Sequence, residues 1–186
     1  MFDAQCDFAA IAYGVAHDPD RLLLDFAEDL RRSGHRVVGA IQHGAHSPDA
    51  AELGAMLLPG EQVVNLGHHR GNNPHGCGIN AGRLAGIART IAASIEEGVD
   101  LVIVNRFGKL EAQGHGMVRL IRQAVDADIP VVTAVPEHRF AAWVRYSGGM
   151  SVRLPCRRAA LDAWWQSVAG RATGLSGGGA FCAIAK

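Results

Sequence analysis

Residues 101–104, with the sequence Leu-Val-Ile-Val, are the feature that most constrains how this chain can fold. The run is too short for an amphipathic helix and is rich in β-branched residues. It therefore predicts a strand buried on both faces, as in a parallel sheet covered by helices. A polar cluster, NRFGKLE over 105–111, follows directly. Ligands of open α/β sheets bind just beyond the carboxyl ends of the strands, so this cluster is the first candidate for a site. The alternative is a solvated loop whose charges pair with one another.

The rest of the chain alternates between strand and helix patterns. Residues 8–13 and 36–42 predict strands on either side of a helix over 19–33, in which apolar residues recur at helical spacing. Such a unit implies a parallel strand pair joined by a right-handed crossover. Further helices are predicted over 80–97, 116–126, 140–143 and 159–168, and further strands over 129–135 and 150–154. This order predicts a three-layer α/β fold with a mainly parallel sheet and P-loop-NTPase-like topology.

The domain organisation is predicted to be simple. Residues 1–170 are expected to form a single α/β domain, and residues 171–186 a glycine-rich tail. Histidines, prolines and glycines interrupt the segment from about 43 to 80, which predicts an irregular insertion over one end of the sheet. Within it, 50–58 predicts a short helix and 62–66 a strand.

Composition and charge exclude several classes of protein. Lysine plus arginine and aspartate plus glutamate both total 18, so no excess charge points to a nucleic acid or an anionic membrane. No apolar run approaches the ~18 residues of a membrane helix, and the first residues do not resemble a secretory signal. The four cysteines form no CxxC pair, which favours reduced thiols over disulfides. These observations predict a cytoplasmic protein without membrane insertion.

The loop after the first predicted strand occupies the position of a phosphate-binding loop but lacks its residues. The motif GxxxxGK[ST] holds phosphates with backbone N–H groups and a lysine. In residues 14–21, GVAHDPDR, the second glycine, the lysine and the hydroxyl residue are all missing, and the carboxylates of Asp18 and Asp20 point into the region. The acidic residue that would hold magnesium at the end of a buried strand is also absent, because Asn105 and Arg106 follow Val104.

Two family resemblances rest on specific segments. FGKLE (107–111), followed by a helix and then IPVVTAVPEHR (129–139), resembles the small nucleoside-triphosphatases among P-loop proteins, in which the corresponding strand ends in an Asp-Glu pair. NRFGKLEAQGHG (105–116), together with GCGIN (76–80), is similar to the bacterial domain-of-unknown-function family 2478 over roughly residues 8–154. The family-type positions are Asn105, Arg106, Gly108, Lys109, Glu111 and Cys77. The resemblance implies an association with molybdate transport but no established activity, and Asn105-Arg106 replaces the catalytic acids of the triphosphatases.

A second constellation, HHRGNNPHGC, covers residues 68–77. His68, His75 and Cys77 offer ligands for a borderline metal such as zinc, although their spacing matches no established zinc motif. Equally, backbone N–H groups around Gly76, Cys77 and Gly78 before a helix predict an anion nest, with Arg70 nearby. The third reading is that the histidines are exposed loop residues and the cysteine is a small buried hydrophobe.

Two functions from different classes remain. The first is a non-hydrolytic binding protein for a small anion, either a molybdate-type oxyanion or a nucleotide phosphate. The second is a nucleotide-dependent phosphohydrolase or phosphotransferase with a rearranged site. The missing lysine and strand-end acid favour the first. Glu111 is expected to pair with Lys109 or Arg106, and the adjacent Trp164 and Trp165 are expected in the core or at a homodimer contact.

Overall fold

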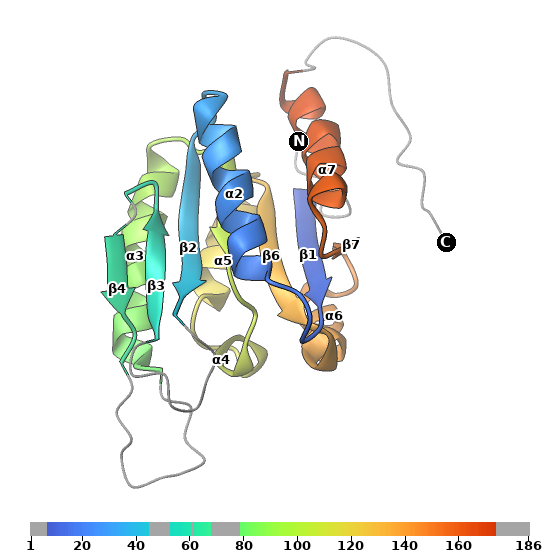
Figure 1. Ribbon diagram of the computed structural model, residues 1–186. Coiled ribbons are helices and arrows are strands. Elements are labelled where there is room, and N and C mark those ends of the chain that lie inside the picture. The colour runs from blue at the N-terminus through green and yellow to red at the C-terminus, as the bar shows by residue number, and fades with distance from the viewer. Residues whose placement is uncertain (1–6, 45–52, 61, 68–78, 174–186) are drawn as a thin grey trace, which may run out of the picture.

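A computed structural model of the chain describes residues 7–44, 53–60, 62–67 and 79–173. Figure 1 shows alternating strands and helices. The elements in chain order are β1 (Phe8–Tyr13), α2 (Pro19–Arg32), β2 (Val37–His43), β3 (Gly54–Leu58), β4 (Gln62–Asn65), α3 (Ala81–Glu96), β5 (Leu101–Val104), α4 (Lys109–Ala112), α5 (Val118–Asp126), β6 (Val131–Pro136), η1 (Glu137–Arg139), α6 (Phe140–Ser147), β7 (Val152–Pro155) and α7 (Arg158–Thr173).

Within the described residues, seven strands form one sheet in the order β4-β3-β2-β5-β6-β1-β7. The five strands from β2 to β7 in this order are parallel, while β3 and β4 pair antiparallel at one edge. β5 is the middle strand of the seven-stranded sheet, and all four of its residues are buried, as its apolar run predicts. The predicted α/β class, mainly parallel sheet and P-loop-like topology are therefore confirmed.

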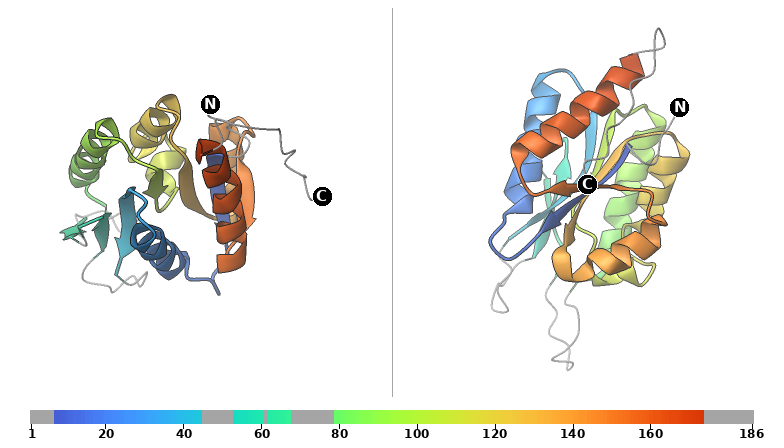
Figure 2. Two further views of the ribbon diagram at one scale, coloured as in Figure 1. Left: turned by 90° about the horizontal axis from the view of Figure 1, so that it is seen from above. Right: turned by 90° about the vertical axis from the view of Figure 1, so that its right-hand side faces the viewer.

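Helices cover both faces of the sheet (Figure 2). α3, α5 and α6 lie on one face, where Leu120, Ile121 and Trp143 join a core with the apolar side chains of the strands. α2 and α7 lie on the other, where Leu23 and Phe26 pack in a second core. Each helix buries one apolar stripe, which is the arrangement that the helical spacing of its sequence predicts.

The paired tryptophans belong to this second core. Trp164 and Trp165 are only 5% and 8% exposed, and Trp165 lies edge-on to Phe26 of α2. The protein's own α2 therefore covers them, which confirms the core reading. The pair gives no support to a homodimer, which stays a prediction.

The short helix predicted over 50–58 is wrong for residues 54–58, which form strand β3. β3 pairs with β2 through the register Gly39↔Leu58, and β4 pairs with β3 in turn. Alanine, methionine and leucine favour a helix when considered alone, but pairing with an existing strand overrides that local preference. The predicted strand at β4 is confirmed for Gln62–Asn65.

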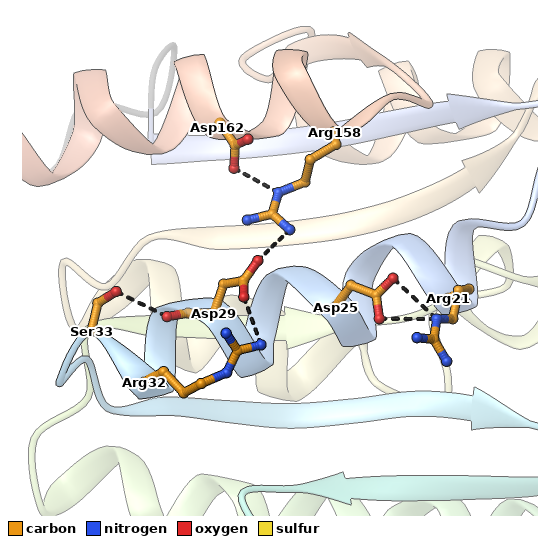
Figure 3. A network of polar contacts seen from close by, with 7 residues as sticks. All are labelled: Arg21, Asp25, Asp29, Arg32, Ser33, Arg158 and Asp162. Carbon is orange, nitrogen blue, oxygen red and sulfur yellow. Dashed lines mark hydrogen bonds and ion pairs between the residues drawn. The ribbon is translucent and has the colours of Figure 1, made fainter.

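A chain of charged contacts joins α2 to α7 (Figure 3). The Arg158 guanidinium binds Asp29 of α2 at 2.6 Å and Asp162 of its own helix at 2.7 Å. Asp29 also binds Arg32 at 2.7 Å. The hydrogen bond from Arg158 lowers the pKa of Asp29 below its ordinary 3.8.

None of the helices in the described part of the chain is long and apolar enough to cross a membrane.

Candidate functional site

The carboxyl ends of β1, β5 and β6 meet at one edge of the sheet. This edge lies at the bottom of Figure 1, where the loop after β1 enters α2 and where α4 follows β5. Parallel pairing fixes the arrangement, because Tyr13 at the end of β1 lies beside Pro136 of β6, and Val104 of β5 lies beside Thr133. The side chains that follow these strands therefore converge, as expected for a ligand site in an open α/β sheet.

The centre of this edge is a charged cluster of Asp20, Asn105 and Arg106. Asp20 Oδ1 accepts a hydrogen bond of 2.6 Å from Asn105 Nδ2, and both Asp20 oxygens accept from Arg106 Nη2 at 3.0 Å. The side chains of Arg106 and Asp20 are only 15% and 21% exposed, and Asn105 is 8% exposed. The guanidinium also lies over the ring of Tyr13, 5.4 Å from its centroid. The Asn105–Arg106 peptide bond is cis.

The partner of Arg106 was not predicted. Asp20 occupies the position that the lysine of GxxxxGK[ST] would have if the motif began at Gly14, and Arg106 stands near the position of the strand-end acid. The two charges of a phosphate-binding apparatus are thus exchanged between the loop and the strand. An aspartate in the loop or an arginine at the strand end would each leave an unpaired charge on its own. The presence of both in one sequence is therefore the signal that could have identified the Asp20–Arg106 pair.

Several polar groups of the loop after β1 are used within the loop itself. The Gly14 N–H donates to His17 Nδ1 at 3.1 Å, and the His17 N–H donates back to the Gly14 carbonyl at 3.1 Å. Asp18 caps α2 by accepting from the Arg21 N–H at 3.0 Å. Pro19 at the first helical position contributes no N–H. These contacts agree with the missing glycine and lysine of the motif.

Glu111 does not pair with Lys109 or Arg106, so that prediction is wrong. Its carboxylate is 5% exposed and accepts from the N–H groups of Gly108 at 2.9 Å and Met117 at 3.1 Å. It therefore ties the start of α4 to the start of α5, because two backbone donors compete successfully with the flexible lysine for its oxygens. Lys109 is exposed, and no ion pair within the described residues holds its ammonium.

Five predicted site residues line one small cavity of about 100 Å³, here called the smaller cavity. These are Asn105, Arg106, Gly108, Lys109 and Glu111. Two buried polar atoms of this group have no hydrogen-bond partner in the described residues, Asn105 Oδ1 and Arg106 Nε. Unpaired buried polar atoms are costly, so they mark a place where a ligand group adds free energy of binding.

The other predicted site residues lie outside the described residues. They are Arg70, Gly76, Cys77 and Gly78 of the anion nest, and His68, His75 and Cys77 of the metal site. In the part of the chain that the structure describes, no three His, Cys, Asp or Glu residues come together as metal ligands.

A second cavity, of about 1070 Å³, opens beside the first and is here called the larger cavity. It is lined among others by Tyr13, Val15, Asp18, Asp20, Arg106 and Glu137. Arg106 lines both cavities. Sequence reasoning did not single out Glu137, because only the topology brings η1 against the loop after β1.

Two titratable groups near this edge stay protonated at neutral pH. Burial raises the pKa of Tyr13, an effect that the Arg106 charge partly opposes. Burial also raises the pKa of Cys156, and the charges of Asp18 and Asp20 raise it further. A protonated thiol is a weaker nucleophile than a thiolate.

Comparison with known proteins identifies the family. The model of a family described as "Protein of unknown function (DUF2478)" matches residues 8–164. The chain belongs to the DUF2478 family. Among curated proteins, the DUF2478 chain is 36% identical over 166 residues to the "Molybdenum import ATP-binding protein ModC 2" of Bradyrhizobium diazoefficiens. That alignment covers 88% of this chain but only 18% of the relative's length. No solved structure matches this DUF2478 chain. A relationship to P-loop triphosphatases stays a prediction.

Proposed function

We propose that this protein binds a small anion, a molybdate-type oxyanion or a nucleotide phosphate, without hydrolysing it. The proposal rests on the observation that Arg106 and Lys109 both line the smaller cavity and both have donor groups that no described residue occupies. Among the described residues, the buried Nε of Arg106 has no hydrogen-bond partner and the ammonium of Lys109 has no ion-pair partner. Two cations at one small cavity favour an anionic occupant.

The size and geometry of the smaller cavity suit a tetrahedral oxyanion. A guanidinium offers a planar fork of donors, and an ammonium adds a compact charge from another direction. The cavity of about 100 Å³ has room for a group of four oxygens around one atom but not for a nucleoside. The similarity to a protein named for molybdenum import supports a molybdate-type oxyanion, and ATP binding in that protein's name supports a phosphate.

The exchanged charges argue against hydrolysis. A P-loop enzyme needs a lysine on the loop to neutralise phosphate and an acid on the strand to hold magnesium. Here Asp20 stands on the loop, and Asn105 and Arg106 stand at the strand end. A carboxylate in the loop repels phosphate, which leaves the β5 end as the side of the site that accepts an anion.

Calorimetric titration with molybdate, tungstate, sulfate, phosphate and ATP tests the proposal. Arg106→Ala should lose more than tenfold in affinity for the bound anion, ~1.4 kcal/mol. Arg89→Ala, which removes an exposed arginine from α3, is the matched control and should bind like the parent. Equal affinity of the Arg106→Ala protein and the parent would contradict the proposed site.

Two further measurements make that result decisive. Arg106→Ala leaves the partly buried Asp20 without its cationic partner, so circular dichroism must show that the variant is folded. Arg106→Lys should recover part of the affinity because it restores the charge. Phosphate release from nucleotides with magnesium tests the absence of hydrolysis. Turnover above ~0.1 s⁻¹, already slow for an enzyme, would support the rearranged phosphohydrolase or phosphotransferase instead.

A further inference from the structure

The larger cavity is too big for the anion alone. Its volume of about 1070 Å³ is roughly ten times that of the smaller cavity. Pockets for organic ligands typically measure about 300–1,000 Å³, so the larger cavity has the size of a site for a nucleotide-sized molecule. It adjoins the smaller cavity through Arg106, which lines both.

The charges of the larger cavity favour hydrogen-bond donors over a second anion. Asp18, Asp20 and Glu137 all line it. Arg106 neutralises Asp20, and Asp18 Oδ1 is engaged as the cap of α2. The carboxylate of Glu137 accepts no hydrogen bond and forms no ion pair with the described residues. A carboxylate with both oxygens unengaged is suited to accept two parallel N–H bonds.

Apart from His17 and His138, the remaining residues that line the cavity are mainly apolar. The ring of Tyr13, the side chain of Val15 and the ring of Pro136 line the cavity, and Val15 is fully exposed. An exposed valine beside an aromatic ring and a proline provides flat apolar contact for a planar group. The backbone N–H groups of Gly14, His17 and Arg21 are already used within the loop.

We infer that the ligand is a phosphorylated compound with a planar ring, in which the ring occupies the larger cavity and Glu137 accepts N–H groups from its edge. This inference rests on the proposed anion site, because Arg106 and Lys109 hold the phosphate. The ring class that fits an unengaged carboxylate has two adjacent N–H donors, as the amino-oxopyrimidine edge of guanine has. Adenine presents a donor beside an acceptor, and that acceptor would face a carboxylate oxygen.

Titration calorimetry with a graded set of probes tests the inference. The probes are inorganic phosphate, ribose 5-phosphate, AMP, GMP and guanosine. GMP should bind at least tenfold more tightly than ribose 5-phosphate or AMP. Glu137→Gln should weaken GMP binding at least tenfold and leave phosphate binding within twofold, since the side chain is exposed and its loss breaks no described contact. Glu96→Gln makes the same charge change at an exposed position of α3 and should alter the affinity for neither GMP nor phosphate.

The outcomes separate the inference from the proposed function. If phosphate binds through Arg106 but GMP binds no better than ribose 5-phosphate, the ring site is overturned and the anion site stands. If phosphate, ribose 5-phosphate and GMP all fail to bind while molybdate binds through Arg106, the inference is overturned and the anion site stands. If molybdate also fails to bind, both are overturned. Equal loss of GMP affinity in Glu137→Gln and Glu96→Gln would overturn the role of Glu137.

Discussion

The two carboxylate oxygens of Asp20 accept hydrogen bonds from a single nitrogen of Arg106, Nη2, each at 3.0 Å. The residues come from different parts of the chain, the first turn of α2 and the end of β5, and both side chains are largely shielded from water. An anion that binds Arg106 therefore meets an internal carboxylate that already occupies part of the guanidinium. Asp20 therefore competes with the proposed ligand for the guanidinium of Arg106.

Asp20→Asn should raise the affinity for anions. Removing the negative charge frees the guanidinium and ends the repulsion of the ligand, so the dissociation constant for molybdate or phosphate should fall about tenfold, ~1.4 kcal/mol. The free energy of unfolding should fall by about 1–3 kcal/mol, because the shielded ion pair is lost. Calorimetric titration and urea denaturation measure the two effects.

The matched control is Asp25→Asn, which breaks an exposed pair with Arg21 on the same helix. It should change the free energy of unfolding by no more than about 0.5 kcal/mol and leave anion affinity unchanged. Weaker anion binding in Asp20→Asn than in the parent would mean that Asp20 supports the ligand rather than competing with it.

Gly116→Ala should destabilise the fold strongly. Gly116 has φ +63°, and a Cβ there would overlap the buried carboxylate of Glu111. The clash and the strained backbone should together lower the free energy of unfolding by about 2–4 kcal/mol. Gly86→Ala is the contrasting control, because a Cβ inside α3 meets nothing within 4 Å there and should stabilise by about 0.5–1 kcal/mol. Equal stability of the two variants, measured by urea denaturation, would contradict the role assigned to Glu111.

Thr133→Val should stabilise the protein. Thr133 is fully buried in β6, and its hydroxyl has no hydrogen-bond partner in the described residues. Replacing the hydroxyl by a methyl group removes a buried unpaired polar atom, which should raise the free energy of unfolding by about 1 kcal/mol. In Thr90→Val the exposed hydroxyl that donates to the Gly86 carbonyl is lost, and stability should change by less than about 0.5 kcal/mol. A destabilised Thr133→Val protein in thermal denaturation would refute the prediction.

The ion pair between Asp29 and Arg158 should make stability depend on acid pH. Arg158 lowers the pKa of Asp29 below its ordinary 3.8, so the unfolded chain binds the proton more tightly than the folded one. The contribution is complete above pH 3.8 and is lost as the pH falls below that value. The difference between urea midpoints at pH 6 and at about pH 3 should therefore be smaller in Asp29→Asn, and likewise in Arg158→Ala. An unchanged difference in both variants would contradict the linkage.

The sequence predicts most of the fold because its buried strands have a distinctive composition. β1, β5 and β6 are continuous apolar runs, and the helices between them have clear apolar stripes, so their order implies the parallel sheet. The local sequence of β3, GAMLL, favours a helix because it includes no β-branched side chain. β3 is a strand because it pairs with β2. That contact joins two separate segments, so the local sequence of β3 does not predict it.

The sequence predicts only the part of the candidate site that follows β5. The cluster after β5 lies at the carboxyl end of that strand, as its sequence predicts, and its role as a ligand site stays a prediction. Asp20 and Glu137 were missed as members of the site, since Asp20 and Arg106 are 86 residues apart in sequence. The pairing of Glu111 with backbone N–H groups was missed for another reason. Its charge suggests a cationic partner, whereas the backbone N–H groups of Gly108 and Met117, on either side of it in sequence, donate to its two oxygens.

One side chain, Arg106, forms part of the wall of both cavities. Any occupant that moves it in one cavity changes what the other cavity offers. Thermodynamic reciprocity then requires that each occupant alter the affinity of the other by the same factor. Two separate molecules bound on either side of Arg106 would thus help or hinder each other equally. If a single molecule reaches both cavities, the coupling between them contributes to the dissociation constant of that one molecule.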